Sequence, residues 1–75
     1  MNITDARELE FAIFCIENVA IFLEKKGPEV YHMLTTDSNI LNEYIIPEYE
    51  MLHTQDKEYI VNDVVRVMKE RGIIG

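Results

Sequence analysis

The chain has 75 residues, of which 48% are apolar, and its 14 acidic and 7 basic side chains leave a net charge of −7. A chain this short fits one domain, residues 1–75, because two separate cores would each be too small to fold. The acidic balance argues against nucleic acid and anionic membrane surfaces as partners, since binding to phosphate groups requires clustered cations.

Cysteine content and hydropathy indicate where the protein works. Cys15 is the only cysteine, so no intrachain disulfide forms, and such a count is typical of the reducing cytoplasm. The longest apolar stretch, residues 11–23, falls short of the ~20 residues that span a bilayer. The acidic segment before it lacks the basic start of a signal peptide. We therefore expect a cytoplasmic protein that does not contact membranes.

The first predicted element is a long helix over residues 5–26. Asp5 or Thr4 supplies the N-cap oxygen, and Glu8 has the spacing of a capping box. The lysine pair in the last turn suits the negative end of the helix dipole. Gly27 is then expected to adopt the left-handed conformation that ends the helix.

This first helix is apolar nearly all round. At ~100° per residue its apolar side chains form two stripes on opposite sides, and Glu10, Glu17 and Glu24 form one charged line. One stripe consists of Leu9, Ala12, Ile13, Ile16, Val19, Ala20 and Leu23, and the other of Phe11, Phe14, Cys15, Ile21 and Phe22. Two interpretations are open. Either the other helices wrap this helix on all sides, or its phenylalanine face contacts another protein or a second copy.

Shorter elements follow the long helix. Proline is favoured in the first turn of a helix, so Pro28 predicts a second helix over residues 28–36. The residues of that helix expected to face inward are Val30, Met33 and Leu34. Turn-forming residues precede a third helix over residues 38–45. Pro47 ends the third helix and begins a short helical turn that reaches Leu52.

The last predicted helix covers residues 56–71 and ends at Gly72. Its expected buried side is made up of Ile60, Val61, Val64, Val65, Val67 and Met68. No segment alternates apolar and polar residues with the period of two that indicates a strand. The sequence therefore predicts an all-α fold, a compact bundle of four to five helices around a long N-terminal helix.

The connection over residues 44–55 is richer in aromatic residues than a plain linker requires. In a structural interpretation, Tyr44 and Tyr49 pack over the core, and His53 or Thr54 caps the final helix. In a functional interpretation, the same residues form a docking surface for a protein or a shallow ligand site. Both interpretations are compatible with the sequence.

The residues that carry chemistry are scattered. Cys15, His32 and His53 stand alone in three different segments, whereas a zinc site requires several such ligands at short spacing. Cys15 has apolar neighbours in mid-helix, which is typical of a core residue and not of a nucleophile. The three glycines form no phosphate-binding loop. We therefore expect no enzyme activity, no cofactor and no metal.

Many positions resemble a family of short bacterial proteins known only as domain of unknown function three-seven-nine-one. They are Glu10-Phe11, Phe14-Cys15-Ile16-Glu17-Asn18, Val30-Tyr31, Leu34, Ser38, Ile40-Leu41, Tyr44-Ile45-Ile46-Pro47, Tyr49, Leu52-His53-Thr54-Gln55, Tyr59-Ile60-Val61 and Asp63. Where this chain has Asp56, that family commonly has glycine. The resemblance implies a bacterial source and no assigned activity. It also implies a genomic association with ADP-ribosyltransferase-like proteins, and hence an accessory or antitoxin-like role.

The sequence thus favours a non-enzymatic module that binds another protein or a second copy of itself. The expected contact residues are Phe11, Phe14, Phe22, Tyr44, Tyr49 and His53. The alternative is a small helical DNA-binding transcriptional regulator, because short helices around a turn can mimic a helix-turn-helix. The charge pattern disfavours that alternative. The cations of the last helix, such as Arg66, share their face with Asp63 and Glu70.

Overall fold

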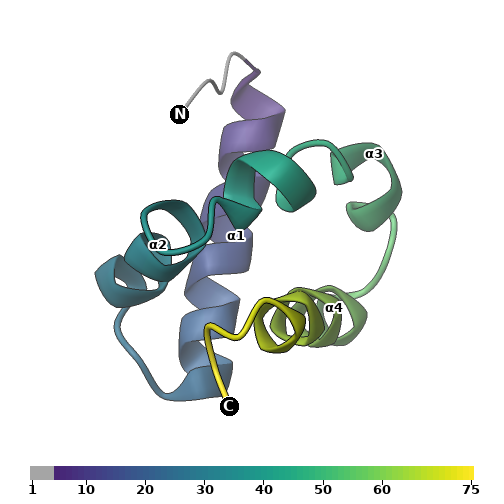
Figure 1. Ribbon diagram of the computed structural model, residues 1–75. Helices are drawn as coiled ribbons and strands as arrows, with labels where there is room; N and C mark the ends of the chain where they lie inside the picture. The colour runs from purple at the N-terminus through teal and green to yellow at the C-terminus, as the bar shows by residue number, and fades with distance from the viewer. Residues whose placement is uncertain (1–4) are drawn as a thin grey trace.

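A computed structural model describes residues 5–75, and all regular structure within that range is helical (Figure 1). The elements are α1 (Ala6–Leu23), α2 (Gly27–Thr35), the π-helical turn η1 (Leu41–Ile45), α3 (Tyr49–Leu52) and α4 (Lys57–Glu70). The all-α prediction, with a bundle around a long N-terminal helix, is confirmed. Asp5 caps α1, since its carboxylate accepts the backbone N–H of Arg7 at 2.8 Å. Thr4, the other predicted cap, lies outside the described residues.

The corner between α1 and α2 differs from the prediction. α1 ends at Leu23, and Glu24, not Gly27, adopts the left-handed conformation, with φ of 57°. The N–H of Lys25 bonds to the carbonyl of Ala20 at 2.9 Å, which closes the helix end. Gly27 instead begins α2. Proline is accommodated in the first turn of a helix, so Pro28 requires α2 to start there, and the corner must form earlier in the chain.

The third helix is shorter and wider than predicted. The structure has a single π-helical turn, in which the N–H of Ile46 bonds to the carbonyl of Leu41 at 3.0 Å. Before it, the Ser38 hydroxyl accepts the N–H of Ile40 and donates to the carbonyl of Met33. The wide turn places Ile40, Leu41 and Ile45 in the core together, and all three are fully buried.

The C-terminal half follows the prediction closely. α3 lies where the turn after Pro47 was expected, and Gly72 is left-handed just after α4. One predicted detail is wrong. Neither His53 nor Thr54 caps α4, because the Asp56 carboxylate accepts the N–H of Tyr59 at 2.8 Å. Asp56 has an extended backbone, with φ of −77°, so a side chain fits there without strain.

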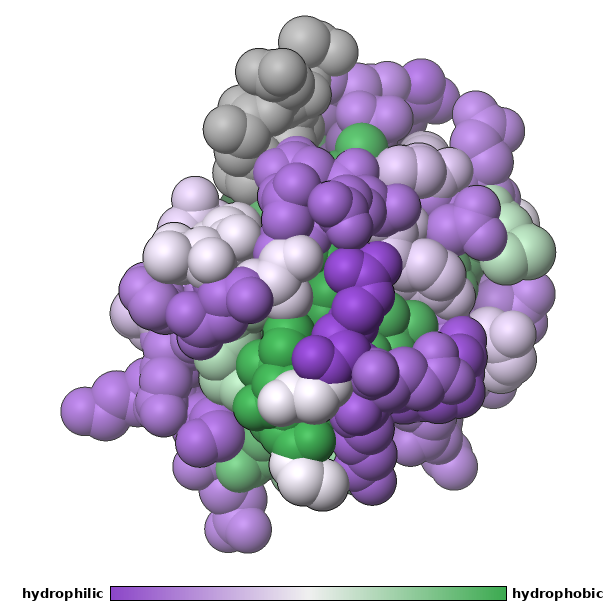
Figure 2. All heavy atoms as spheres, in the orientation of Figure 1, coloured by the Kyte–Doolittle hydropathy of each residue, from purple (hydrophilic) through white to green (hydrophobic). Residues whose placement is uncertain are grey.

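α1 is the helix around which the core is built. It runs behind the other elements in Figure 1, with α2 crossing it on one side and α4 on the other. Every buried side chain in the described range is apolar. On the face seen in Figure 2, an apolar patch between α2 and the C-terminal end of α4 is ringed by hydrophilic residues. Ile73 and Ile74, just beyond α4, pack against the core.

The orientation of α1 about its own axis differs from both predicted stripes. Its buried residues are Phe11, Ala12, Cys15, Val19 and Ala20, which come from both of them. Leu9, Ile13, Ile21 and Phe22 are exposed. The reason is geometric. α2 and α4 approach α1 from two directions, so the buried arc is centred between the stripes, and residues at their outer edges, such as Ile13 and Ile21, remain outside. Phe22 is exposed because it lies in the last turn of α1.

Candidate functional site

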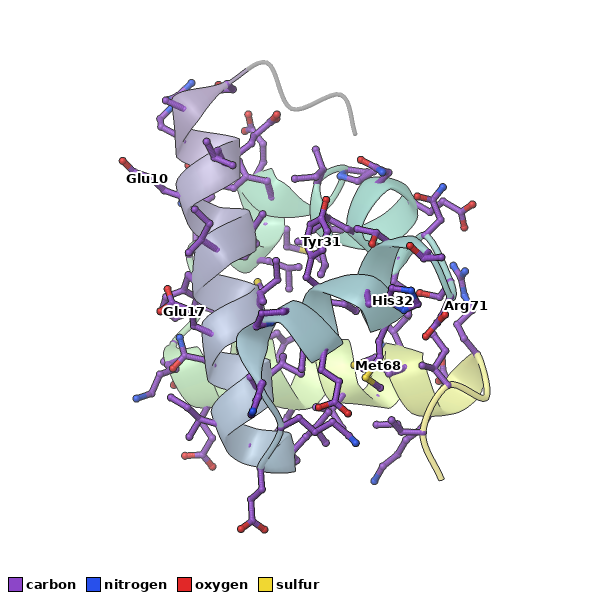
Figure 3. The ribbon with its side chains drawn as sticks, turned by 90° about the vertical axis from the view of Figure 1, so that its left-hand side faces the viewer. Glu10, Glu17, Tyr31, His32, Met68 and Arg71 are labelled. Atoms are coloured by element: carbon purple, nitrogen blue, oxygen red, sulfur yellow. The ribbon has the colours of Figure 1, made fainter. Side chains whose placement is uncertain are left out.

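The outer face of α1 is the side turned away from the core, and it carries the acidic line. Glu10 and Glu17 are exposed on this face, and Glu24, the third residue of the predicted line, is exposed just beyond the end of α1. Figure 3 shows Glu10 and Glu17 pointing away from the other helices along one edge of α1. Ile13 and Ile21 flank this line and are 46% and 74% exposed. This face therefore combines regularly spaced negative charge with large apolar side chains in water.

An aromatic cluster joins α1 to α3 beside this face. The rings of Phe11 and Phe14 stack with centroids 6.3 Å apart, and Tyr49 meets Phe11 edge-on at 5.3 Å. His53 stacks on Tyr49 at 4.6 Å with an interplanar angle of 14°. These distances are those of favourable aromatic pairs. Residues from two distant segments are thus held in one continuous aromatic surface.

The cluster forms one side of an open groove of about 420 Å³. The groove is lined by Arg7, Glu10, Phe11, Phe14, Tyr49, His53 and Gln55. Four of the six predicted contact residues therefore meet at one place. Phe11 contributes least to the surface, because it is only 8% exposed and belongs mainly to the core.

Phe22, the fifth predicted contact residue, lies in a second groove, between α1 and the start of α4. That groove has a volume of about 290 Å³ and is lined by Asn18, Ile21, Phe22, Lys57, Glu58, Val61 and Asn62. Phe22 is 55% exposed there. The predicted phenylalanine face of α1 is therefore split between two grooves that lie along the same helix.

Tyr44, the sixth predicted residue, lies apart from both grooves. Its hydroxyl donates a hydrogen bond to the Asp63 carboxylate, and Arg66 bonds to Asp63 at 2.8 Å and to Glu70 at 2.9 Å. Desolvation, assisted by the bond to the Asp63 anion, raises the pKa of Tyr44 to about 12. Tyr44 thus holds η1 against α4 and takes no part in the grooves.

Some residues of these grooves were missed from the sequence. Arg7 was not singled out, and Asn18 and Ile21 were not among the predicted contact residues. Ile13, on the outer face, was not predicted as a contact residue either, although it is exposed. Only the seven-residue spacing of the glutamates indicated the outer face. Periodicity could not fix the rotation of α1, because apolar residues occur on every side of it.

The side chains that could act as a nucleophile or as metal ligands are placed unfavourably for either role. Cys15 is fully buried, and desolvation raises the pKa of its thiol to about 12, so the reactive thiolate is suppressed. Within residues 5–75, no three or more His, Cys, Asp or Glu side chains are grouped so that they could hold a metal ion. None of the helices in the described part of the chain combines the length and apolarity needed to cross a membrane.

The fold and grooves define an acidic all-α domain with an open, partly aromatic surface along its longest helix. Residues 10–71 match the family described as "Protein of unknown function (DUF3791)". The chain belongs to this family, as the resemblance indicated, and the matched segment contains all six predicted contact residues. No match was found among curated proteins or among solved structures.

Proposed function

We propose that this chain is a non-enzymatic protein-interaction module that uses the outer face of α1 and the exposed last turn of that helix. The single observation that carries the proposal is the exposure of Ile21 and Phe22, 74% and 55%, on the helix that forms the centre of the fold. Fully burying such a side chain is worth about 1.5–3 kcal/mol. A partner that covers both residues would recover part of that free energy, against the cost of association.

No element within residues 5–75 covers these two residues. α2 and α4 already occupy the inward side of α1, where Cys15 and Val19 are fully buried. Ile21 lies beyond the reach of that core, beside the start of α4. Large apolar side chains gathered on one exposed face are typical of interaction sites.

We propose that the partner is a protein in the bacterial cytoplasm, and that this chain is accessory or antitoxin-like to an ADP-ribosyltransferase-like protein. The family resemblance supports the bacterial setting and the type of partner. The net charge of −7 supports it physically, because an acidic domain is attracted to the basic cleft that binds a nucleotide.

The arrangement of the cations weighs against the alternative function as a DNA-binding regulator. Arg66 is paired with both Asp63 and Glu70, and Arg71 pairs with Glu43 at 3.1 Å. Arg7 pairs with Asp5, also at 3.1 Å. All three arginines are therefore engaged by acids of the same chain, whereas DNA binding requires cations that are free to meet phosphates.

Co-purification of the tagged full chain from its native cell tests the proposed function. We expect a stable partner that is lost when Ile21 and Phe22 are both replaced by Ser. The matched control is Tyr31→Ser, which removes an exposed apolar side chain from α2. A strict monomer without partner at micromolar concentration would overturn the proposal. A partner retained by the double variant would also overturn it, provided that circular dichroism shows the variant to be folded.

A further inference from the structure

The two grooves beside α1 are joined by a third, which makes one continuous surface. The middle groove is lined by Glu10, Ile13, Phe14, Glu17, Asn18 and Ile21. It shares Glu10 and Phe14 with the groove beside α3, and Asn18 and Ile21 with the groove beside α4. We call this surface, from Arg7 to Phe22, the α1 groove.

The walls of the α1 groove come from different elements. α1 contributes residues along the whole length. Opposite α1 stand Tyr49 and His53 at one end, and Lys57 and Val61 at the other, whereas the middle section is an open surface formed by α1 alone. The lining is largely side chain, because the backbone N–H and carbonyl groups of α1 are used within the helix. A strand would find no free edge there to pair with, so the surface suits a ligand that docks through side chains.

The length of the groove fits a short helix. Fifteen residue steps separate Arg7 from Phe22, which corresponds to about 22 Å at 1.5 Å per residue. A helical segment of about 15 residues, or four turns, has the same length. Its apolar stripe could lie against Phe14, Ile21 and Phe22, in the helix-in-groove mode of recognition.

The charge of the groove rim indicates which sign of charge a partner should carry. Glu10 and Glu17 stand exposed on the α1 rim, about 10.5 Å apart at 1.5 Å per residue. Arg7 is already paired with Asp5, and Lys57 lies next to Glu58 in the same wall. The lining contains Glu10, Glu17 and Glu58 against Arg7 and Lys57, so its net charge is negative. Cations spaced seven residues apart on a partner helix would meet both glutamates.

The same charge argues against a second copy as the occupant. In a symmetric pair the same surface faces itself. Two α1 grooves packed together would bring Glu10 and Glu17 of one copy close to the same residues of the other. Like charges placed opposite one another across an interface cost several kcal/mol. A basic partner faces no such cost.

We propose that the α1 groove binds a cationic amphipathic helix of about 15 residues that belongs to another protein. This inference rests on the proposed function and specifies the chemistry of the partner. Apolar residues of the bound helix cover Phe14, Ile21 and Phe22, and its Lys or Arg side chains pair with Glu10 and Glu17. The net charge of −7 increases the rate of encounter.

Synthetic peptides test the inference on the full chain. The probe is a 15-residue peptide of Leu and Lys in amphipathic helical order. One control has the same composition in scrambled order, and a second has Glu in place of Lys. We expect the amphipathic Lys peptide to bind with a Kd of about 1–100 μM and at least about 10-fold more tightly than the scrambled peptide. Backbone NMR shifts should move along residues 7–22, and the Glu peptide should not bind.

Two variants with matched controls locate the binding. Glu17→Lys should weaken the binding of the Lys peptide about 5-fold or more, whereas Glu29→Lys on α2 changes the net charge equally and should have little effect. Ile21→Ser should also weaken it about 5-fold or more, and Tyr31→Ser should not. These residues are exposed, so the variants are expected to remain folded.

The possible failures are distinguishable. Equal binding of the amphipathic and scrambled peptides, or NMR shifts confined to other surfaces, would overturn the inference. So would a cellular partner that depends on Ile21 and Phe22 but docks through a segment that is not a cationic helix, and this result leaves the proposed function intact. Peptide binding in the groove, with a cellular partner that is indifferent to these residues, would overturn the proposed function instead.

Discussion

α1 and α4 are the two longest helices, with 18 and 14 residues, and they use their apolar residues differently. In α4, Tyr59 is the only large apolar residue left exposed, and the remaining ones are buried on one face. In α1, the apolar residues continue beyond the buried face to Ile13 and Ile21, and Phe22 is exposed in the last turn. Apart from Tyr59, packing within the chain explains the apolar residues of α4, whereas it does not explain those of α1.

This difference separates the apolar side chains that stabilise the fold from those that the fold does not require. Removing an apolar side chain from the inside of either helix should cost stability. Removing an exposed apolar side chain from α1 should cost little, because about half or more of its surface is already in water. Matched substitutions of buried and exposed apolar residues test this difference, with the free energy of unfolding as the measured quantity.

The largest effect is expected for Phe11→Ala compared with Phe22→Ala. Phe11 is 8% exposed and supports the Tyr49 ring, so its removal should lower the free energy of unfolding by about 3–5 kcal/mol. Phe22→Ala should cost less than about 1 kcal/mol, since more than half of its side chain is already in water. Urea unfolding followed by circular dichroism measures both. Equal losses would mean that Phe22 belongs to the fold after all.

A second matched pair places the same chemical change in both helices. Ile60 of α4 is 3% exposed, so Ile60→Ala should lower the free energy of unfolding by about 2–5 kcal/mol. Ile21→Ala on the outer face of α1 should change it by no more than about 0.5 kcal/mol. Thermal or urea unfolding gives both values. A substantial loss at Ile21 would contradict the division of α1 into an inner and an outer face.

The alkaline stability of the fold tests the inner face of α1 through Cys15. Burial raises the pKa of its thiol to about 12 in the folded state, whereas an unfolded cysteine ionises near about 8.5. Above that pH the unfolded chain holds fewer protons than the folded chain, so stability falls as pH rises, by up to about 1.4 kcal/mol per pH unit. Below about pH 8 the thiol contributes no pH dependence.

Urea midpoints between about pH 8 and pH 10.5 measure this dependence, with Cys15→Ala as the control. The control should lose less stability over the same range, because it has no thiol to ionise. Modification by a thiol reagent gives an independent readout. Cys15 should react slowly in the folded chain, and a cysteine introduced by Ile21→Cys into the Cys15→Ala background should react quickly. Fast modification of native Cys15 would contradict its burial.

The smallest effect is expected at the helix caps. Asp56→Ala removes the oxygen that accepts the N–H of Tyr59 and should cost about 1 kcal/mol, within a range of about 0.5–2. Asp56→Asn keeps the acceptor and should cost little. Asp5→Ala should have less effect than Asp56→Ala, because the first buried residue of α1 is Phe11, more than a turn after the cap, whereas Ile60 is buried in the first turn of α4. The reverse order, measured by urea unfolding, would contradict this.

The elements that could be predicted are those fixed by local chemistry. Pro28 places the start of α2, and Gly72 marks the end of α4. The left-handed Glu24 could not be predicted, since it results from where Pro28 requires the next helix to begin. The π-helical turn of η1 was also missed, because its wide geometry serves the packing of Leu41 and Ile45, which is a tertiary requirement.

The candidate site could be predicted only in part, because its composition is visible in the local sequence but its assembly depends on tertiary packing. Tyr49 and His53 drew attention through the density of aromatic residues around them, and they meet Phe11 in space. Tyr44 has a similar local sequence but faces Asp63, which lies 19 residues away. Whether a ring points toward a groove or toward a neighbouring helix depends on how the helices cross. Residue spacing within one helix contains no information on that crossing.

The wholly apolar interior has a consequence for how related chains can diverge. Side chains such as Leu34, Ile45 and Met68 make no directional bonds through polar atoms, and every buried residue in the described range is of this kind. Exchanges that conserve volume in such an interior usually cost less than about 1.5 kcal/mol. Sequence drift should therefore be tolerated inside the domain. Conservation of Glu17 or Ile21 among relatives would therefore indicate a role in partner binding, because folding gives no reason to retain these exposed residues.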